Sequence, residues 1–425
     1  MKMKAIALMG AIVLCSLFFV AMSATAIAAE EDDYVLDIYG NANEDDTIDM
    51  RDLTYVKLIF FGKKPETELA DAKYDGKINP LDFIQIKLII VGKEEELTVV
   101  DSADRIVTIK KPIECIATIF TDGSEALKIL GAWDKVVGIG TYGSDPILYS
   151  NVDELPVITE PRNPYGVNYE KVFELHPDIF LAPYLHMPGF DDMVANIEPE
   201  IPVVAMNFNE PDTIVKNFRK LGLILGQEDE VEEFIEFYKR VEADISAVTS
   251  KIPEEDKPRV FFKAGWALTN LMTHTDKYSG ALYRYELTGH RNIAADLPSP
   301  GGWVQVDPEW LIEQDPDIVI CGCGKNIFGL GVDDTSAAEA LRNEIMNLDV
   351  FSGGSAVKNG DVYLIASNFI CTPGYIVGLA YQAKWYHPDL LQDLDPQAIH
   401  KEYLTRFMRI DYDLEKHGVF VYPEP

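Results

Sequence analysis

One duplicated unit near the N-terminus constrains the fold of that region more than any other feature. The stretch GNANEDDTIDMRDLTYVKLIFFGK (residues 40–63) has a near-copy thirty residues later, ADAKYDGKINPLDFIQIKLIIVGK (70–93). Each copy joins a loop rich in oxygen-bearing side chains to an apolar segment of helical length. Two copies in register predict two equivalent loop–helix units that pack together as a small all-α domain, which we place at residues 30–98.

The spacing of oxygen donors in both loops is typical of calcium binding. Ca²⁺ takes about six to eight oxygen ligands, which a tight loop supplies from alternate positions and from its last position. In the first loop the predicted ligands are Asn41, Asn43, Asp45, Thr47 (through its carbonyl), Asp49 and Asp52. In the second they are Asp71, Asp75, Lys77 (through its carbonyl), Asn79 and Asp82. Lys73 takes a position where an oxygen ligand is expected, so we predict two Ca²⁺ sites, the second weaker.

The last ligand of each loop is Asp rather than the bidentate Glu of an ordinary EF-hand, and no helical pattern precedes either loop. In these respects residues ~35–93 resemble a type I dockerin, a pair of calcium loop–helix repeats. The resemblance implies docking onto a cohesin domain of another protein. The alternative, acidic surface turns joined to core helices, has to explain two loops that match in register.

Length, charge and the N-terminal segment narrow the function of the whole chain. A length of 425 residues predicts two or three domains. The net charge of −33 argues against binding nucleic acid or docking on anionic lipid through charge alone. After the basic MKMK, residues 5–29 form an uncharged run that ends in small residues. This pattern predicts a signal peptide at 1–29, or a retained membrane anchor. We therefore expect an exported protein that is extracellular or attached to the cell surface.

From residue 99 onward, apolar strand patterns alternate with helical patterns. A first set includes CIATIF (115–120) and DIFLAP (178–183), and a second begins at RVFFKAG (259–265) and includes GDVYLIA (360–366). The alternation predicts an α/β fold with parallel strands, in two lobes at about 99–209 and 257–425. The intervening ~210–250 carries an apolar stripe at helical spacing, which predicts one long, rigid connecting helix.

Several longer segments resemble, in order, the metal-chelate binding proteins that serve importers of siderophores, haem and cobalamin. They are VTIKKPIECIATIFTDGSEALKILGAWDKVVGIG, YEKVFELHPDIFLAP, GGWVQVDPEWLIEQDPDIVICG, AVKNGDVYLI and YHPDLLQDLDPQAIHKEYLTRF. The resemblance spans 99–425 and implies a solute-binding domain, with the ligand held in a cleft between two lobes. It also implies delivery of the ligand to the membrane permease of an ABC importer, and no enzymatic activity.

Ligands of open α/β sheets bind beyond the carboxyl ends of the strands, and large rings lie in those loops here. The predicted ligand contacts are Tyr142, Tyr184, Trp266, Trp303 and Phe369, with Asn368 as a polar partner. Such rings bury the apolar area of a planar chelate, while a few polar groups orient it. Tyr142, Trp303 and Phe369 fall where the resemblance places ligand contacts of cobalamin-binding members. For each ring the alternative is a place in the core of a lobe.

Two glutamates have a role that the resemblance alone implies. In this family one acidic residue on each lobe pairs with arginines of the permease, and the matching positions are Glu170 and Glu309. Each begins a predicted helix, where a carboxylate is also favoured by the helix dipole. Permease docking and helix capping both remain open as explanations.

The sequence does not fix the ligand. A ferric, siderophore-like chelate is the first expectation, a corrinoid such as cobalamin the second, haem the third and an oxyanion such as molybdate the fourth. The few basic residues expected in the cleft are Lys263, Lys325 and Arg162, which weakens the case for a strongly anionic siderophore.

Sequence patterns for other functions are weaker. His186 could ligate a bound iron, and Cys321 and Cys323 could hold a metal or form a redox pair, but neither pattern is specific. A bare-metal binder would need several convergent His, Asp or Glu ligands, and no strand-end loop carries such a set. No hydrolase or nucleotide-binding motif occurs. The alternative of another class is a cell-surface assembly component that acts through dockerin–cohesin binding.

Overall fold

The structure is a computed structural model that describes residues 34–141, 145–160, 163–184, 187–265, 269–276, 281–299, 302–324 and 327–425. The apolar run at 5–29 lies outside these residues, as do the predicted contacts Tyr142 and Trp266. His186, Arg162 and Lys325 lie outside them as well. Within the described part of the chain, no helix combines the length and the apolar character that crossing a membrane requires.

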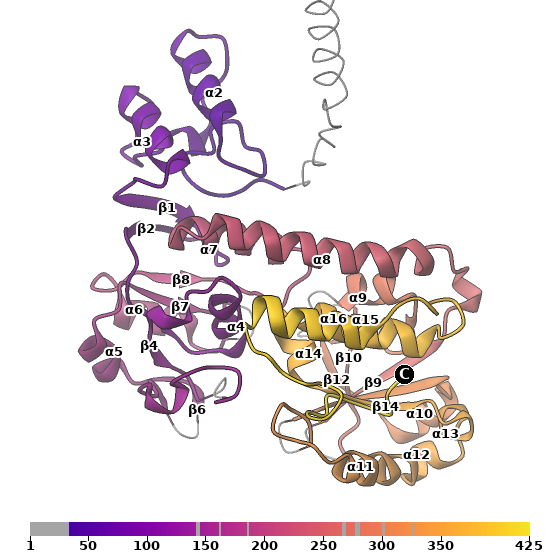
Figure 1. Cartoon of the computed structure of the whole chain (residues 1–425). Helices are drawn as coiled ribbons and strands as arrows, with labels where there is room; N and C mark the ends of the chain where they lie inside the picture. Colours follow the sequence, from indigo (N-terminus) through magenta and orange to yellow (C-terminus); the bar gives the residue numbers. More distant parts are fainter. Residues whose placement is uncertain are drawn as a thin grey trace, which may run out of the picture.

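The N-terminal residues form a small module of two loop–helix units, α2 (Met50–Phe60) and α3 (Pro80–Ile90) (Figure 1). Both helices begin in the same way: the side chain at the N-cap, Asp49 or Asn79, accepts from the helix backbone. The side chain three residues later, Asp52 or Asp82, accepts from the backbone of the cap residue. This reciprocal capping box stabilises the first turn of each helix. The module has its own core, made largely by Leu53, Val56, Ile59, Ala70, Ala72 and Ile86.

The module is seated on the rest of the protein rather than separated from it. Its first segment runs beside strand β1 (Glu96–Val100), because the Tyr39 amide donates to the Thr98 carbonyl at 2.9 Å and the Val100 amide to the Asp37 carbonyl at 2.9 Å. β1 pairs with β2 (Ile106–Lys110) as an antiparallel hairpin. Leu36 and Ile38 of the module belong to the main hydrophobic core of the body.

The first lobe is built on a parallel sheet of strand order β4-β3-β7-β8. Its strands are β3 (Ile116–Thr118), β4 (Val136–Ile139), β7 (Ile179–Ala182) and β8 (Val203–Ala205). Every residue of β3, β7 and β8 is buried, as expected for a parallel sheet covered on both faces. The covering helices include α4 (Thr121–Ile129), α5 (Tyr169–Leu175) and α6 (Phe190–Ile197).

The second lobe repeats this plan with the strand order β11-β9-β13-β14-β15. The strands are β9 (Arg259–Ala264), β11 (Arg291–Asn292), β13 (Ile318–Cys323), β14 (Val362–Ala366) and β15 (Val421–Tyr422). All pairings are parallel except β14 with β15. Its helices include α9 (Ala281–Thr288), α10 (Pro308–Gln314), α14 (Asn368–Cys371) and α15 (Tyr375–Tyr386), and a short antiparallel pair, β10 (Met272–His274) with β12 (Trp303–Gln305), lies beside it.

One helix–strand unit occurs in both lobes with the same local design. α5 and α10 each end at a residue in the left-handed conformation and are followed by Pro-Asp and a strand. The Asp178 carboxylate accepts from the amides of Glu114 (2.7 Å) and Cys115 (2.8 Å), just before β3. The Asp317 carboxylate accepts from the Arg259 amide (2.8 Å) at the start of β9. Each aspartate thus ties its own strand to the neighbouring one, and the lobes are structural counterparts.

Two helices, rather than the single one expected, occupy the segment between the lobes. α7 (Ile214–Leu225) ends at Gly226, whose φ of 68° is left-handed, and α8 (Glu228–Thr249) follows. Glycine takes this conformation without steric cost, which explains the break. The predicted apolar stripe of α8 is buried from Val231 to Ile245. α8 spans about 33 Å at 1.5 Å per residue and packs against α7, α9 and α15 across the top of both lobes (Figure 1).

Candidate functional site

The carboxyl ends of the strands in both lobes carry the loops that sequence reasoning assigned to a ligand cleft. Tyr184 follows β7 and is 42% exposed, with its ring 5.2 Å from that of Phe190. Trp303 in β12 is half-buried and meets the His274 ring edge-on at 5.8 Å. Asn368 is exposed at the start of α14. Two of the predicted rings therefore offer surface to a ligand, one on each lobe.

Phe369 has a different environment from the other predicted contacts. Its side chain is 2% exposed and packs against Tyr381, His400 and Phe420, with ring centres 4.9 to 5.9 Å away. In this structure Phe369 is a residue of the second-lobe core, which is the alternative that the sequence left open for each ring.

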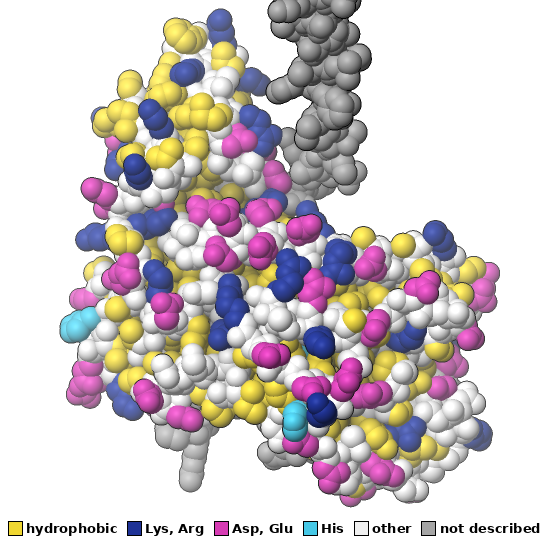
Figure 2. Space-filling model, viewed as in Figure 1, with side chains coloured by type: hydrophobic (Ala, Val, Ile, Leu, Met, Phe, Trp, Pro, Cys, Tyr) yellow, Lys and Arg dark blue, Asp and Glu magenta, His cyan; other side chains and the backbone are white. Residues whose placement is uncertain are grey.

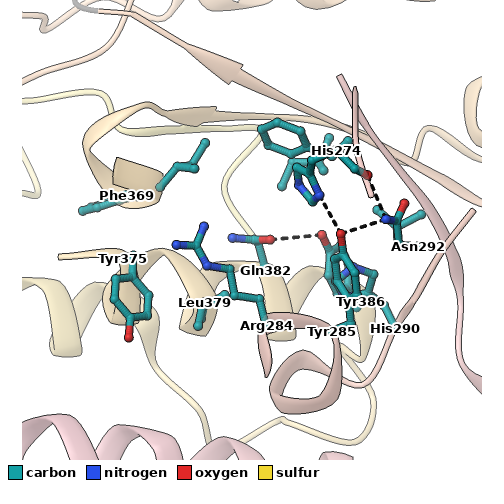
Figure 3. A pocket seen from close by; sticks show the side chains of 14 residues that line it. His274, Arg284, Tyr285, His290, Asn292, Phe369, Tyr375, Leu379, Gln382 and Tyr386 are labelled. Atoms are coloured by element: carbon teal, nitrogen blue, oxygen red, sulfur yellow. Dashed lines mark hydrogen bonds between the residues drawn. The ribbon is translucent and has the colours of Figure 1, made fainter. Parts of the chain in front are cut away.

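A small cavity lies inside the second lobe (Figure 3). Its volume of about 30 Å³ suits an ordered water and not a chelate. The Tyr285 hydroxyl is hydrogen-bonded to His274 Nδ1 at 2.6 Å, and the Asn292 amide donates to that hydroxyl at 2.8 Å. Burial lowers the pKa of His274 to about 3, and that of His290 likewise. These imidazoles are therefore neutral, and the cavity is part of the internal framework of the second lobe.

Arg284 is a residue between the two lobes that sequence reasoning missed. It lies on α9, is half-buried, and its Nη2 donates to the Asn209 carbonyl of the first lobe at 3.0 Å. Its guanidinium carbon lies 5.0 Å from the centre of the Tyr375 ring. The segment YRYELT reads as an ordinary amphipathic helix, so no local signal distinguishes this arginine. By contrast Lys263, which was expected in the cleft, is 1% exposed.

A buried carboxylate joins the two lobes. Glu125 on α4 is 4% exposed, and its Oε1 accepts from the Thr372 hydroxyl at 2.8 Å, the Gly374 amide at 2.9 Å and the Tyr403 hydroxyl. Burial raises the pKa of Glu125 to about 7, although these three hydrogen bonds oppose the rise. Asp122, one helical turn earlier, has its pKa raised to about 6, also by burial.

The two predicted docking glutamates occupy equivalent places. Glu170 and Glu309 are exposed, and each is the second residue of its helix, α5 or α10. Because these helices are structural counterparts, the glutamates stand at matching positions on the two lobes. The N-caps that accept from each helix backbone are other residues, Asn168 and Asp307, so neither glutamate is needed as a cap.

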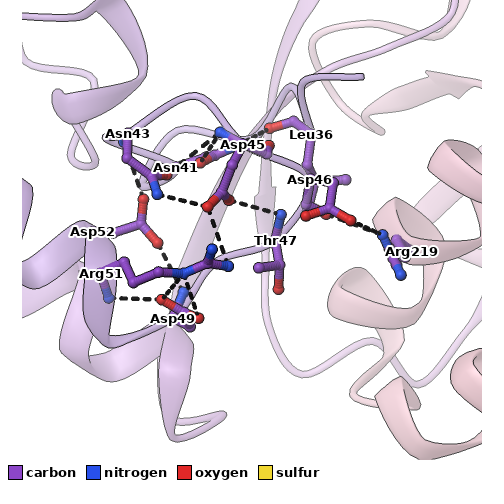
Figure 4. A network of polar contacts seen from close by, with 10 residues as sticks. All are labelled: Leu36, Asn41, Asn43, Asp45, Asp46, Thr47, Asp49, Arg51, Asp52 and Arg219. Carbon is purple, nitrogen blue, oxygen red and sulfur yellow. Dashed lines mark hydrogen bonds and ion pairs between the residues drawn. The ribbon is translucent and has the colours of Figure 1, made fainter. Parts of the chain in front are cut away.

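The first predicted calcium loop gathers its oxygen atoms around Asp52 (Figure 4). The Asp52 carboxylate is fully buried and accepts from the amides of Asn43 (3.1 Å) and Asp49 (2.7 Å). Burial raises its pKa to about 6, and the charges of Asp45 and Asp49 add to the rise. Arg51 bridges those two carboxylates at 3.1 and 3.0 Å. A positive charge is thus favoured at this point, and Arg51 supplies it here.

The remaining predicted ligands of the first loop lie in the same network. Asn41 donates to the Asp45 carbonyl at 2.6 Å, and the Thr47 amide donates to Asp45 Oδ1 at 3.0 Å. In the second loop the Asp82 carboxylate accepts from Lys73 and Asn79 amides at 2.9 and 2.7 Å. Asp71 accepts from the Gly76 amide and Asp75 from the Lys77 amide. The two loops therefore share one backbone design, although their sequences differ.

The oxygen donors fit the chemistry that Ca²⁺ prefers, but their arrangement here is not that of a formed metal centre. Across the described ranges, no three His, Cys, Asp or Glu side chains converge in a way that could hold a metal ion. In the first loop, Ca²⁺ would have to displace the Arg51 side chain, which is half-exposed. Cys321 and Cys323 are buried free thiols with their sulfur atoms 3.9 Å apart.

The two-lobed body is similar to proteins of one family. Residues 116–369 match the profile of the periplasmic binding proteins. An uncharacterized ABC transporter substrate-binding lipoprotein of Bacillus subtilis, YvrC, is 24% identical over 301 residues, which cover 70% of this chain and 87% of that protein. A cobalamin-binding protein of Halobacterium salinarum is 23% identical over 298 residues, 68% and 74% of the two chains. The TroA-like periplasmic binding protein FepB of Veillonella parvula superposes with a TM-score of 0.61 at 21% identity, covering 77% of this chain and 99% of that one.

Proposed function

Because this chain belongs to the periplasmic binding protein family and is an exported solute-binding protein of an ABC transporter, we propose that its cleft captures an organic metal chelate for delivery to a permease. The observation that carries the proposal is the pairing of two equivalent lobes whose strand ends present the large rings of Tyr184 and Trp303. Rings that are partly exposed beside a cleft suit a large, partly apolar ligand better than a bare ion.

Two kinds of chelate are candidates. A ferric, siderophore-like chelate is the first expectation from the sequence. A corrinoid is the second, and one observation favours it: the relative from Halobacterium salinarum is a cobalamin-binding protein. Haem and oxyanions such as molybdate are tested as well, because they are the third and fourth expectations from the sequence.

The ligand proposal is tested by tryptophan fluorescence of the full chain during titration with ferric siderophores, cobalamin, haemin and molybdate. Saturable quenching by a ferric siderophore, cobalamin or haemin, lost in Trp303→Ala, would support the proposal and name the ligand class, whereas a response to molybdate alone would refute it. Trp133→Phe is the matched control, because Trp133 is buried in the first lobe with its indole N–H donating to the Ser150 carbonyl. A wild-type protein that responds to none of the four would refute the chelate proposal.

We propose that Glu170 and Glu309 dock the protein on its permease. Their support is geometric: both are exposed and stand at counterpart positions of the two lobes. Two exposed carboxylates facing permease arginines would contribute mainly electrostatic attraction and orientation. The double variant E170Q/E309Q should bind ligand normally and lose ligand-stimulated ATPase activity with the reconstituted transporter. Glu174→Gln, on the same helix as Glu170, is the control; equal activity of both proteins would refute the assignment.

We propose that the N-terminal module binds two Ca²⁺ ions and acts as a protein-docking unit of the dockerin type. The support is the repeated loop design, the buried carboxylates Asp52 and Asp82, and a set of exposed apolar side chains on the module. These are Met50 (65% exposed), Phe61 (74%), Leu81 (56%), Ile84 (51%) and Val91 (53%). Apolar and basic side chains gather on the outer part of the module in Figure 2. Such a concentration is typical of a surface that meets another protein.

The calcium proposal is tested by calorimetric titration of the full chain with CaCl₂. The first site should be the tighter, because Lys73 replaces an oxygen donor in the second loop. Asp52→Asn should remove the tighter binding event and Asp82→Asn the weaker one. Asp413→Asn, a change of equal charge on the surface of the second lobe, should leave both events intact. Absence of any binding heat in the wild type would refute the proposal. A cohesin pull-down with and without Ca²⁺ tests the partner.

A further inference from the structure

A groove separate from the cleft runs between the N-terminal module and the first half of α8. Its lining residues come from 36–92 of the module and from 219–239 of α7 and α8. Its volume of about 960 Å³ is far larger than that of the cavity inside the second lobe and lies in the range of sites that receive other molecules. Because the module and the body each form one side, the groove exists only while the module is seated on α7.

The floor of the groove is lined by aliphatic side chains from both sides. Some of them are buried, but others keep part of their surface open, namely Ile48, Ile90 and Val91 of the module and Leu223 of α7. Val91 is the most open of these, at 53% exposed. Apolar surface gathered in a groove is buried favourably when a second molecule covers it.

The wall that α8 contributes to the groove is strongly acidic. Among the described lining residues six are acidic and three are basic, and two of the basic ones, Arg51 and Arg219, already pair with carboxylates. The acidic side chains on α8 are Glu228, Asp229, Glu230, Glu232 and Glu236. Figure 2 shows acidic side chains gathered on the body just below the module. Charge complementarity therefore favours a cationic partner in this groove.

The lining residues of α8 also follow one side of that helix. Positions 228, 231, 232, 235, 236 and 239 recur at helical spacing, and the stretch from 228 to 239 is about 17 Å long at 1.5 Å per residue. A partner helix of about three turns matches this length. The described lining residues all belong to helices and loops, so they offer no strand edge to an extended peptide. An amphipathic helix would meet the apolar floor and the acidic wall at once.

We infer that this groove binds a basic amphipathic helix of another protein. The aliphatic side chains of that helix lie against Ile48, Ile90 and Val91, and its lysines or arginines face the acidic residues of α8. The inference goes beyond the proposed function, because the groove lies outside the cleft and half of it belongs to the body rather than to the module. A partner bound here contacts the module and the body together and so stabilises the seated module.

The test uses designed peptides as probes, because the partner is identified by its chemistry alone. A fluorescent peptide of leucine and lysine, about four helical turns long with leucine on one face, is titrated with the full chain and followed by fluorescence anisotropy. A second peptide has the same composition in an order that forms no apolar face, and a third has glutamate in place of lysine. The first peptide should bind the wild-type protein well above the other two, and added salt should weaken its binding.

Two variants of the groove are each compared with a matched control. E228Q/D229N/E236Q removes three exposed carboxylates from the acidic wall, and E233Q/E339Q/E344Q removes three exposed carboxylates that do not line the groove. The first triple variant should lose about five- to tenfold in affinity and the second almost none. V91S removes apolar surface from the groove and should weaken binding about two- to fivefold. I312S, at a position 54% exposed on the second lobe, should leave binding unchanged.

Several outcomes would overturn the inference. If the peptide without an apolar face binds as tightly as the amphipathic one, the protein attracts cations through its net charge alone. Equal losses in the two triple variants would lead to the same conclusion, and a wild-type protein that binds none of the peptides has no such site. A dimer that forms without peptide in sedimentation experiments, and that E228Q/D229N/E236Q or V91S dissociates, would show that a second copy of this chain occupies the groove. None of these results bears on the titrations of the cleft.

Discussion

The buried carboxyl of Glu125 predicts an unusual dependence of stability on pH. Its pKa rises from 4.5 to about 7 on folding, chiefly because it is buried. Between these two values the folded protein holds a proton that the unfolded chain has lost. The folded state therefore binds more protons, and the free energy of unfolding falls as pH rises through this window. A rise of about 2.5 pKa units corresponds to about 3 kcal/mol, lost in full above pH 7.

Glu125→Gln isolates this contribution. Glutamine keeps an oxygen that can accept from Thr372, Gly374 and Tyr403 but has no proton to lose. Urea unfolding measures the free energy of unfolding of both proteins. Between pH 4.5 and pH 8, that of the variant should rise relative to that of the wild type by about 3 kcal/mol. Titration of groups that do not interact with Glu125 is common to both proteins and cancels in the difference, whereas Asp122, whose charge contributes to the raised pKa of Glu125, shares part of the change. Glu309→Gln, at an exposed position, is the control for the loss of one negative charge. A difference between Glu125→Gln and the wild type that stays constant over this range would refute the reasoning.

Three further predictions concern the framework. Arg219→Ala removes the contacts of α7 with Asp46 and Tyr34 of the module, each 2.8 Å long, and should speed proteolytic release of the module at otherwise unchanged body stability. Phe369→Ala should lower the free energy of unfolding by about 3–5 kcal/mol in urea, because its ring is enclosed in the second-lobe core. Asp178→Ala and Asp317→Ala should each lower the free energy of unfolding by about 1–3 kcal/mol, because each removes the acceptor for backbone amides of a neighbouring strand. An unchanged stability of either variant would contradict the equivalent role of these aspartates in the two lobes.

The parts of the fold that local patterns determine were predicted well. The two α/β lobes follow from the alternation of apolar strands with helical segments, and the α8 stripe from spacing alone. The repeated loop–helix units follow from matched spacing of donors and apolar residues. The break at Gly226 was missed, although a glycine after an apolar helical run is an ordinary signal for the end of a helix. The apolar pattern continues through α8, and it favoured the prediction of one uninterrupted helix.

The parts that depend on distant residues could not be read from the sequence. Glu125 receives its donors from residues 247 to 278 positions later in the chain, and nothing near it indicates this. Arg284 lies in a segment whose pattern fits a surface helix, and only the approach of Asn209 from the other lobe makes it a contact between the lobes. Phe369 follows a strand end, as a ligand contact would, yet its ring turns into the core.

The seating of the module has a consequence for how any partner would act on the cleft. Arg219 on α7 pairs with Asp46 inside the first predicted calcium loop and with Glu232 on α8. Lys216 and Lys220, also on α7, pair with Asp37 just before that loop. The module is therefore fixed to the helices that cross the lobes, and a partner bound to it also holds the cleft in a set orientation. Because Asp46 lies between predicted ligands and pairs with Arg219, any effect of Ca²⁺ binding on module seating must equal the effect of seating on Ca²⁺ affinity, as linkage requires of coupled equilibria.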